Sequence, residues 1–249
     1  MKLYRFGIGL LILSLGSVAL AQNNLPRPEV AQVKAKLGAV VAAMGDAPAG
    51  YVKEPEDFNL PTEFSPAQAK DKFWPISSSV SVNYTDQGVQ DAQATADQAS
   101  EDFEARYAAA LASGDPNAIA RMTQEMLKIS SLAAAAAFSS DAKEDMSVYI
   151  QFNGNPYAAI DPDGVLFERP GVIALVDLPE RKEVVVYLDP IALKETETLS
   201  SFTLSTPDDG VGNRIGVYNI TITLDGEPED IEAFAQSFDT DAMLAQITR

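Results

Sequence analysis

The spacing of apolar residues changes from a helical to a strand-like period near Asp141, and this change constrains the fold more than any other feature. Before it, two long stripes recur every three or four residues, which is typical of amphipathic helices. After it, apolar and polar residues alternate, which is typical of half-buried strands in an antiparallel sheet. The chain is therefore predicted to be α+β, with an N-terminal helix and an αα-hairpin followed by a mainly antiparallel β-sheet with C-terminal helices.

The segment before the hairpin predicts one helix, a long connection and one strand. Apolar residues from Val30 to Met44 recur at helical spacing, and Gly45 suits the position after a helix end. Prolines interrupt the chain from Asp46 to Phe73, so an irregular connection is expected there. The segment Ile76–Thr85 then alternates and predicts a strand, with these residues on one face: Ile76, Val80, Val82 and Tyr84.

Two helices are predicted between Gln87 and Phe138, separated by Ser113-Gly114-Asp115-Pro116. Gly114 can end a helix in the left-handed conformation, and Asp115 and Pro116 suit the start of the next one. So short a break makes the helices antiparallel neighbours. The facing stripes are Val89, Ala92, Ala96, Ala99, Phe103, Tyr107 and Ala110 in the first helix, and Ile119, Met122, Met126, Ile129 and Leu132 in the second.

The C-terminal part predicts a sheet closed by helices. Alternating or continuous apolar runs indicate strands at Met146–Phe152, Val172–Val176, Val184–Leu188, Phe202–Leu204 and Tyr218–Leu224. The two continuous runs, Val172–Val176 and Val184–Leu188, are expected to be central or covered on both faces. Helical spacing returns from Ile231 to Phe238 and at Thr240–Ile247. The strand at 76–85 can join this sheet, so residues 22–138 and 139–249 form either one domain or two.

Residues 1–21 have the three-part pattern of a secretory signal peptide. Lys2 and Arg5 precede an apolar run, and Ala19-Leu20-Ala21 provides small residues before a cut ahead of Gln22. The run is shorter than the roughly 20 residues that span a bilayer, which favours cleavage over a membrane anchor. We therefore expect a periplasmic or secreted chain of 228 residues and net charge −20, without stable membrane insertion. The absence of cysteine fits a bacterial envelope or exterior.

Composition excludes several chemistries. The chain has no Cys and no His, so thiolate nucleophiles, imidazole metal ligands and Ser-His-Asp triads are impossible. The net charge of −18 argues against binding to nucleic acid or to anionic lipid. No cofactor is predicted, and no catalytic residue can be nominated.

Few segments suggest a site, and each also has a structural interpretation. Asp161-Pro162-Asp163-Gly164 with Glu168 offers oxygen ligands for Ca²⁺ at Asp161, Asp163 and Glu168, but a tight turn explains the same residues. Ser140 and Lys143 have the spacing of a serine–lysine pair, at a place where a helix ends. Gly210-Val211-Gly212 is typical of a hairpin turn.

An acidic segment precedes the C-terminus. Its seven carboxylates, with no base among them, are Asp225, Glu227, Glu229, Asp230, Glu232, Asp239 and Asp241. Carboxylates are favourable near a helix N-terminus, so solvated helix starts are expected, with a basic partner or a divalent cation as the alternative.

Two hypotheses for function follow from export and from the lack of a complete catalytic motif. The first is a non-catalytic binding or structural module of the periplasm or exterior, whose partner is another envelope or secreted protein. The alternative is an exported hydrolase that uses paired carboxylates, with or without a bound cation. Carboxylates converging in a pocket would favour the hydrolase, and an apolar groove would favour the binder. The oligomeric state is left open by the sequence.

Overall fold

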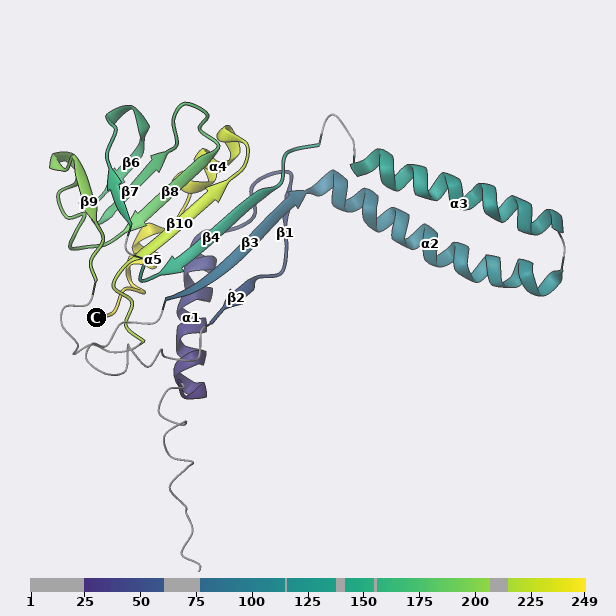
Figure 1. The fold of residues 1–249 in the computed structure, drawn as a ribbon, viewed down its shortest axis with the longest axis horizontal. Helices are drawn as coiled ribbons and strands as arrows, with labels where there is room; N and C mark the ends of the chain where they lie inside the picture. The colour runs from purple at the N-terminus through teal and green to yellow at the C-terminus, as the bar shows by residue number, and fades with distance from the viewer. Residues whose placement is uncertain (1–24, 61–76, 115, 138–141, 155, 207–214) are drawn as a thin grey trace, which may run out of the picture.

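The computed structural model describes residues 25–60, 77–114, 116–137, 142–154, 156–206 and 215–249. Figure 1 shows a body built on one large sheet and a pair of long helices that projects from it. The helices are α1 Arg27–Ala43, α2 Gln87–Ser113, α3 Pro116–Ala137, α4 Pro228–Gln236 and α5 Thr240–Leu244. The strands are β1 Tyr51–Lys53, β2 Asp57–Asn59, β3 Ser78–Asp86, β4 Met146–Phe152, β5 Tyr157–Ala159, β6 Val165–Arg169, β7 Val172–Val176, β8 Glu183–Leu188, β9 Ser201–Thr203 and β10 Ile220–Asp225.

The main sheet is antiparallel throughout. Its strand order is β1-β3-β4-β10-β8-β7-β6, and β2 also pairs with β3. The register sets Tyr149 of β4 between Ser81 of β3 and Thr223 of β10. β3 and β4 are neighbours, so α2 and α3 are inserted at the turn between two paired strands.

One face of the sheet carries the main core. Alternate residues of β3, β4, β8 and β10 are fully buried, among them Val80, Val82, Tyr84, Val148, Ile150, Val186, Ile220 and Ile222. They pack against the apolar side of α1, α4 and α5, which cover this face, with Leu37, Val41, Ile231, Phe234 and Met243 in the contact. Among the residues that the structure describes, the core contains none from α2 or α3.

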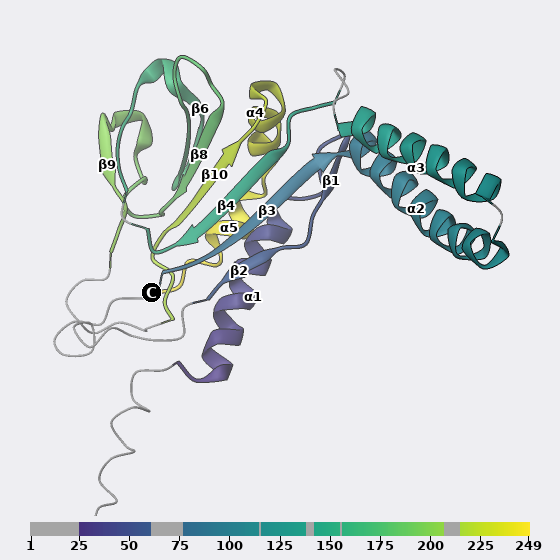
Figure 2. The same cartoon turned by 45° about the vertical axis from the view of Figure 1, so that its right-hand side comes forward.

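The other face of the sheet is only partly covered. A second, smaller cluster forms there under the two-stranded sheet of β5 and β9, and comprises Ile173, Leu193, Phe202 and Leu204. Elsewhere this face presents polar residues and Tyr149, which is 41% exposed. Figure 2 shows that the part of the main sheet that contains β6 and β8 curves away from β3 and β4, with β9 beside it.

The α+β prediction is confirmed, and so are the helices and the long strands. The connection from Asp46 onwards was expected to be irregular, and this was wrong, because it contains β1 and β2. β5 and β6 were also missed. Several predicted features lie outside the described residues: the signal peptide at 1–21, the Asp115 cap, Ser140 and the glycines at 210 and 212.

Candidate functional site

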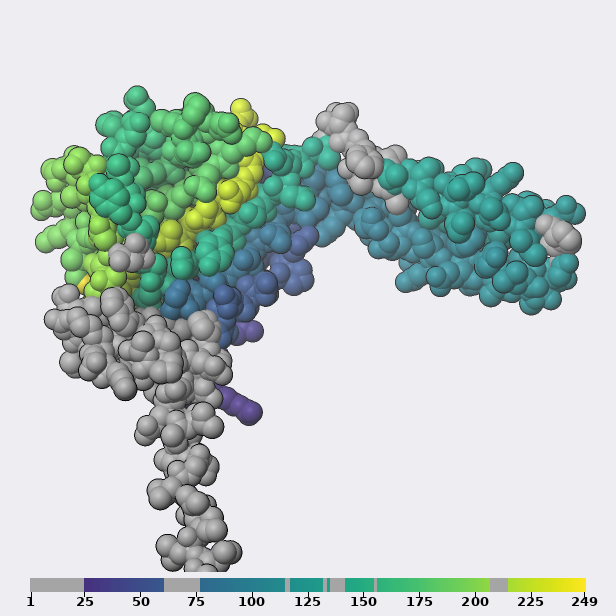
Figure 3. Space-filling model, in the orientation of Figure 1, coloured from purple at the N-terminus to yellow at the C-terminus, as the bar shows by residue number. Residues whose placement is uncertain are grey.

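We call α2 and α3 together the arm. The arm leaves the end of the sheet and lies clear of the body (Figure 3). α2 begins where β3 ends, because the Asp86 carboxylate accepts a hydrogen bond of 2.9 Å from the Val89 amide. It ends at Gly114, whose φ of 68° is the left-handed conformation predicted for that position.

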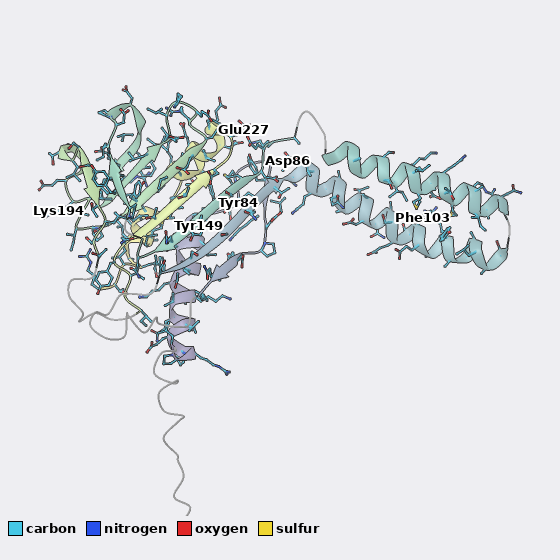
Figure 4. The ribbon with its side chains drawn as sticks, in the orientation of Figure 1. Tyr84, Asp86, Phe103, Tyr149, Lys194 and Glu227 are labelled. Atoms are coloured by element: carbon cyan, nitrogen blue, oxygen red, sulfur yellow. The ribbon has the colours of Figure 1, made fainter. Side chains whose placement is uncertain are left out.

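Past the first turn of α2, the described residues of the two helices pack on each other and not on the body. In α2 the predicted stripe is turned inward, yet Ala96 is its only buried side chain among those described. Phe103 stacks on Tyr107 with ring centroids 5.6 Å apart, and Figure 4 shows Phe103 between the helices. Two helices share one narrow seam, so the arm has no third layer that would complete a core.

This thin packing leaves large apolar side chains in solvent. Leu111 is 50% exposed, Met126 48% and Leu127 63%. Met126 was predicted to lie in the facing stripe, and this was wrong, because Ile119, Met122 and Ile129 occupy the seam while Met126 lies beside it. The arm thus presents an apolar surface that the body does not cover.

The arm also carries an apolar groove of about 240 Å³. Its lining residues are Ala92, Thr95, Ala96, Ala99 and Ile129. Alanines on α2 are too small to fill the space opposite Ile129. An apolar groove is the feature that was expected to favour a binding protein over an enzyme.

The charges of the arm are divided between its helices. α2 has five acidic residues and one basic residue, whereas α3 has two basic residues and one acidic residue. Arg106 of α2 and Glu125 of α3 form an ion pair of 2.7 Å across the seam. This pair marks one flank of the arm as polar.

A polar cluster holds the root of the arm to the body. Both oxygens of the Asp230 carboxylate lie 3.0 Å from the Lys143 ammonium, and one of them lies 3.0 Å from the Tyr51 hydroxyl. Lys143 also lies 4.8 Å from the centre of the Tyr51 ring, and its amide donates to Asp86. These residues come from β1, the end of β3, the segment before β4, and α4, so the cluster joins four parts of the body where the arm starts.

The protonation states of Tyr51 and Asp86 fit a structural role for this cluster. Burial and the hydrogen bond with Asp230 raise the pKa of Tyr51, so its hydroxyl stays protonated. Amide donors from Val89 and Lys143 lower the pKa of Asp86, which stays ionised and caps α2. Neither group is prepared to act as a nucleophile or a base near neutral pH.

The predicted calcium residues do not lie together in one group of ligands. Asp161 and Asp163 form a tight turn, in which the Asp161 carboxylate accepts from the Asp163 amide at 3.0 Å. Glu168 lies in β6 and lines a separate cleft of about 350 Å³ with Lys194, Glu195 and Glu197. In the described part of the chain, no group of three or more acidic side chains is arranged to hold a metal ion. Calcium binding stays a prediction.

The acidic segment before the C-terminus serves helix starts and ion pairs. Glu229 and Asp230 lie in the first turn of α4, and Asp239 caps α5 by accepting from the Ala242 amide. Glu232 pairs with Arg181 at 2.7 Å. The pairing of Asp230 with Lys143 was not predicted, because 87 residues separate the two and no local pattern joins them.

One pair of carboxylates lies opposite each other on the open face of the sheet. Asp225 of β10 is in register with Glu183 of β8. Burial, then the charges of Asp225 and Asp177, raise the pKa of Glu183. A carboxyl group with a raised pKa beside a second carboxylate is the arrangement expected for an acid and base pair.

Comparison with models of protein families, with curated proteins and with solved structures finds no match to this chain. None of the described helices has the length and apolar character needed to cross a bilayer. The candidate site is therefore defined by geometry alone: an arm with exposed apolar residues, joined to the body by a polar cluster.

Proposed function

We propose that this protein is an exported, non-catalytic binding module and that the arm is its binding element. The N-terminal pattern at residues 1–21 supports export. The body supplies a support for the arm, because its core, in the described part of the chain, includes no residue of the arm. The partner is a protein of the envelope or the exterior.

The exposure of Leu111, Met126 and Leu127 carries this proposal. Single exposed apolar residues are ordinary, but a helix pair that projects from the body and exposes three of them is typical of an interaction surface. Their burial by a partner would be favourable by roughly 25 cal/mol for each Å² removed from water.

Removal of the arm tests the proposal. A short Asn-Gly linker in place of residues 87–142 would join β3 directly to β4, whose Tyr84 and Met146 are already paired. Partners would be crosslinked in intact cells that make either the full chain or the armless chain. We expect partners with the full chain only. Recovery of the same partners with the armless chain would contradict the proposal.

The hydrolase alternative is favoured by one observation, the facing pair of Glu183 and Asp225. Glu183, protonated more readily than an ordinary glutamate, would act as the acid and Asp225 as the base. Turnover of a glycoside or ester substrate by the purified chain, abolished in Glu183→Gln and retained in the armless chain, would support it. Absence of turnover in the full chain is expected if the arm is the functional element.

A further inference from the structure

The charged residues of α3 occupy one stripe of the helix. They are Arg121, Glu125 and Lys128, spaced four and three residues apart, and Glu125 is the partner of Arg106 in α2. The remaining surface of α3 is uncharged. On it, at spacing that shares one side of a helix, lie the exposed residues that we call the α3 face: Thr123, Met126, Leu127, Ser130 and Ala134.

The Thr123 hydroxyl of the α3 face is compatible with burial. The Thr123 hydroxyl donates to the Ile119 carbonyl of its own helix at 3.2 Å, so it does not depend on water for that bond. Ala134 and Ser130 are small and would let another helix approach closely. Met126 and Leu127 supply the apolar area at the middle of the helix.

We propose that the occupant of the α3 face is a second copy of this chain, so that two arms form a four-helix bundle; this inference rests on the proposed function of the arm. A two-fold axis at the middle of α3 would place Met126 and Leu127 of one copy against the same residues of the other. The two α3 helices would then pack antiparallel, as neighbouring helices of a bundle do, and each arm would keep its own seam.

Charge favours a second copy over other occupants. An α3 face that meets its own copy brings no acidic residue into the contact, and it keeps the acidic α2 helices on the outside of the bundle. A cationic protein would be attracted to the outer side of α2, which has five acids, and would leave Met126 and Leu127 exposed. An anionic membrane would be repelled by the same acids.

The length of α3 sets the size of such an interface. α3 has 22 residues, which gives about 33 Å at about 1.5 Å per residue. A strip of that length and about 10 Å width, one helix diameter, covers about 330 Å² on each copy. This is below the roughly 600 Å² per partner of a stable interface, so a weak dimer that depends on concentration is expected. The arm stands away from the body in all views, so the body does not block a second arm (Figures 1 to 3).

Sedimentation of the full mature chain over a range of concentrations tests this inference. We expect a monomer–dimer equilibrium whose Kd rises by at least about tenfold in Met126→Glu/Leu127→Glu, because two buried charges oppose burial at the centre. Ala94→Glu/Ala105→Glu adds the same charge on exposed positions of α2, away from the α3 face, and should change Kd little. Circular dichroism would show that both variants keep their helices.

A chemical crosslink gives a second readout. The chain has no cysteine, so Leu127→Cys creates a single thiol. A short bismaleimide should join two copies through Cys substituted at 127, near the two-fold axis, and should not join copies of Ala105→Cys. A monomer at every concentration, or a dimer unaffected by the double glutamate variant, would overturn the inference. So would binding to neutral phosphatidylcholine vesicles, in the absence of self-association, that the same variant abolishes.

The same variants separate this inference from the proposed function. Partners captured in cells by the full chain, lost in the armless chain and different from the chain itself, would retain the arm as a binding element and reject the second copy. Capture that is equal with and without the arm would reject both.

Discussion

The ring and the hydroxyl of Tyr84 have opposite effects on the stability of the fold. Its ring is fully buried and packs edge-on against Phe234, with centroids 5.4 Å apart. Its hydroxyl is buried as well and meets no hydrogen-bond partner among the described residues. Burial raises the pKa of Tyr84 to about 12. The ring therefore stabilises the core, and the hydroxyl opposes burial.

Tyr84→Phe should leave the free energy of unfolding unchanged or raise it by up to about 1 kcal/mol, since it removes an unpaired polar atom and keeps the ring. The tyrosine favours folding less as pH rises from about 10, where the unfolded chain ionises, towards 12. The alkaline loss of stability should therefore be smaller in the variant. Urea unfolding at pH 7 and pH 10.5 measures both effects. A loss of more than 1 kcal/mol at pH 7 would mean that the hydroxyl has a partner.

Glu183 gives a pH dependence of the same sign in the acidic range. Its pKa is raised in the folded chain, so its ionised form disfavours folding, and this cost is relieved as pH falls through the raised pKa. Glu183→Gln should raise the free energy of unfolding by about 0.5–1 kcal/mol at pH 7 and have little effect below about pH 4. Urea unfolding at the two pH values measures this. Equal effects at both would show that neither burial of the charge nor repulsion by Asp225 and Asp177 is the cause.

At the scale of elements, the parts with a strong periodic pattern were predictable and the short parts were not. The arm, β3, β4 and β10 each contain enough alternating or helically spaced residues to define their faces. β1, β2 and β5 have three residues each, too few for a period, and exist because a neighbouring strand supplies their hydrogen bonds. β6 was missed because Leu166 and Phe167 are adjacent and do not alternate.

The candidate site also has features that the sequence predicts and features that it does not. The inward stripe of the arm could be read from the sequence, because helix periodicity is local. The exposure of Met126 could not, because it depends on how many layers cover the helix. The contact of Lys143 with Asp230 joins the segment before β4 to α4, and no local sequence pattern predicts it.

Gly114→Ala and Gly38→Ala are matched tests of the predicted helix end. An added Cβ meets nothing within 4 Å at either position, so only the backbone differs. Gly114 has φ of 68°, and alanine there should cost about 1 kcal/mol. Gly38 lies inside α1, where alanine should stabilise by about 0.5–1 kcal/mol. Thermal unfolding followed at 222 nm compares them, and equal signs would contradict the assignment of Gly114 as the end of α2.

At the scale of the whole molecule, the free energy of unfolding of the body is expected to depend little on the arm. All described residues of the core lie in the body, and the arm joins the body at the ends of β3 and β4. The armless chain should therefore unfold cooperatively, with a free energy of unfolding within about 2 kcal/mol of the full chain, since a shorter loop also costs less entropy. Urea unfolding followed by tyrosine fluorescence measures this. An armless chain that does not fold would show that the arm is part of the body's core.

Because the arm is inserted between two paired strands, the length of its helices sets the distance between the body and the tip of the arm. α2 has 27 residues, so its tip lies about 40 Å from the body at about 1.5 Å per residue. Both ends of the arm connect to the same end of the paired strands β3 and β4. A heptad added to each helix would therefore move the tip outward by about 10 Å and leave every strand in place. In an antiparallel bundle the bodies lie at opposite ends, and the number of helical turns fixes the distance between them.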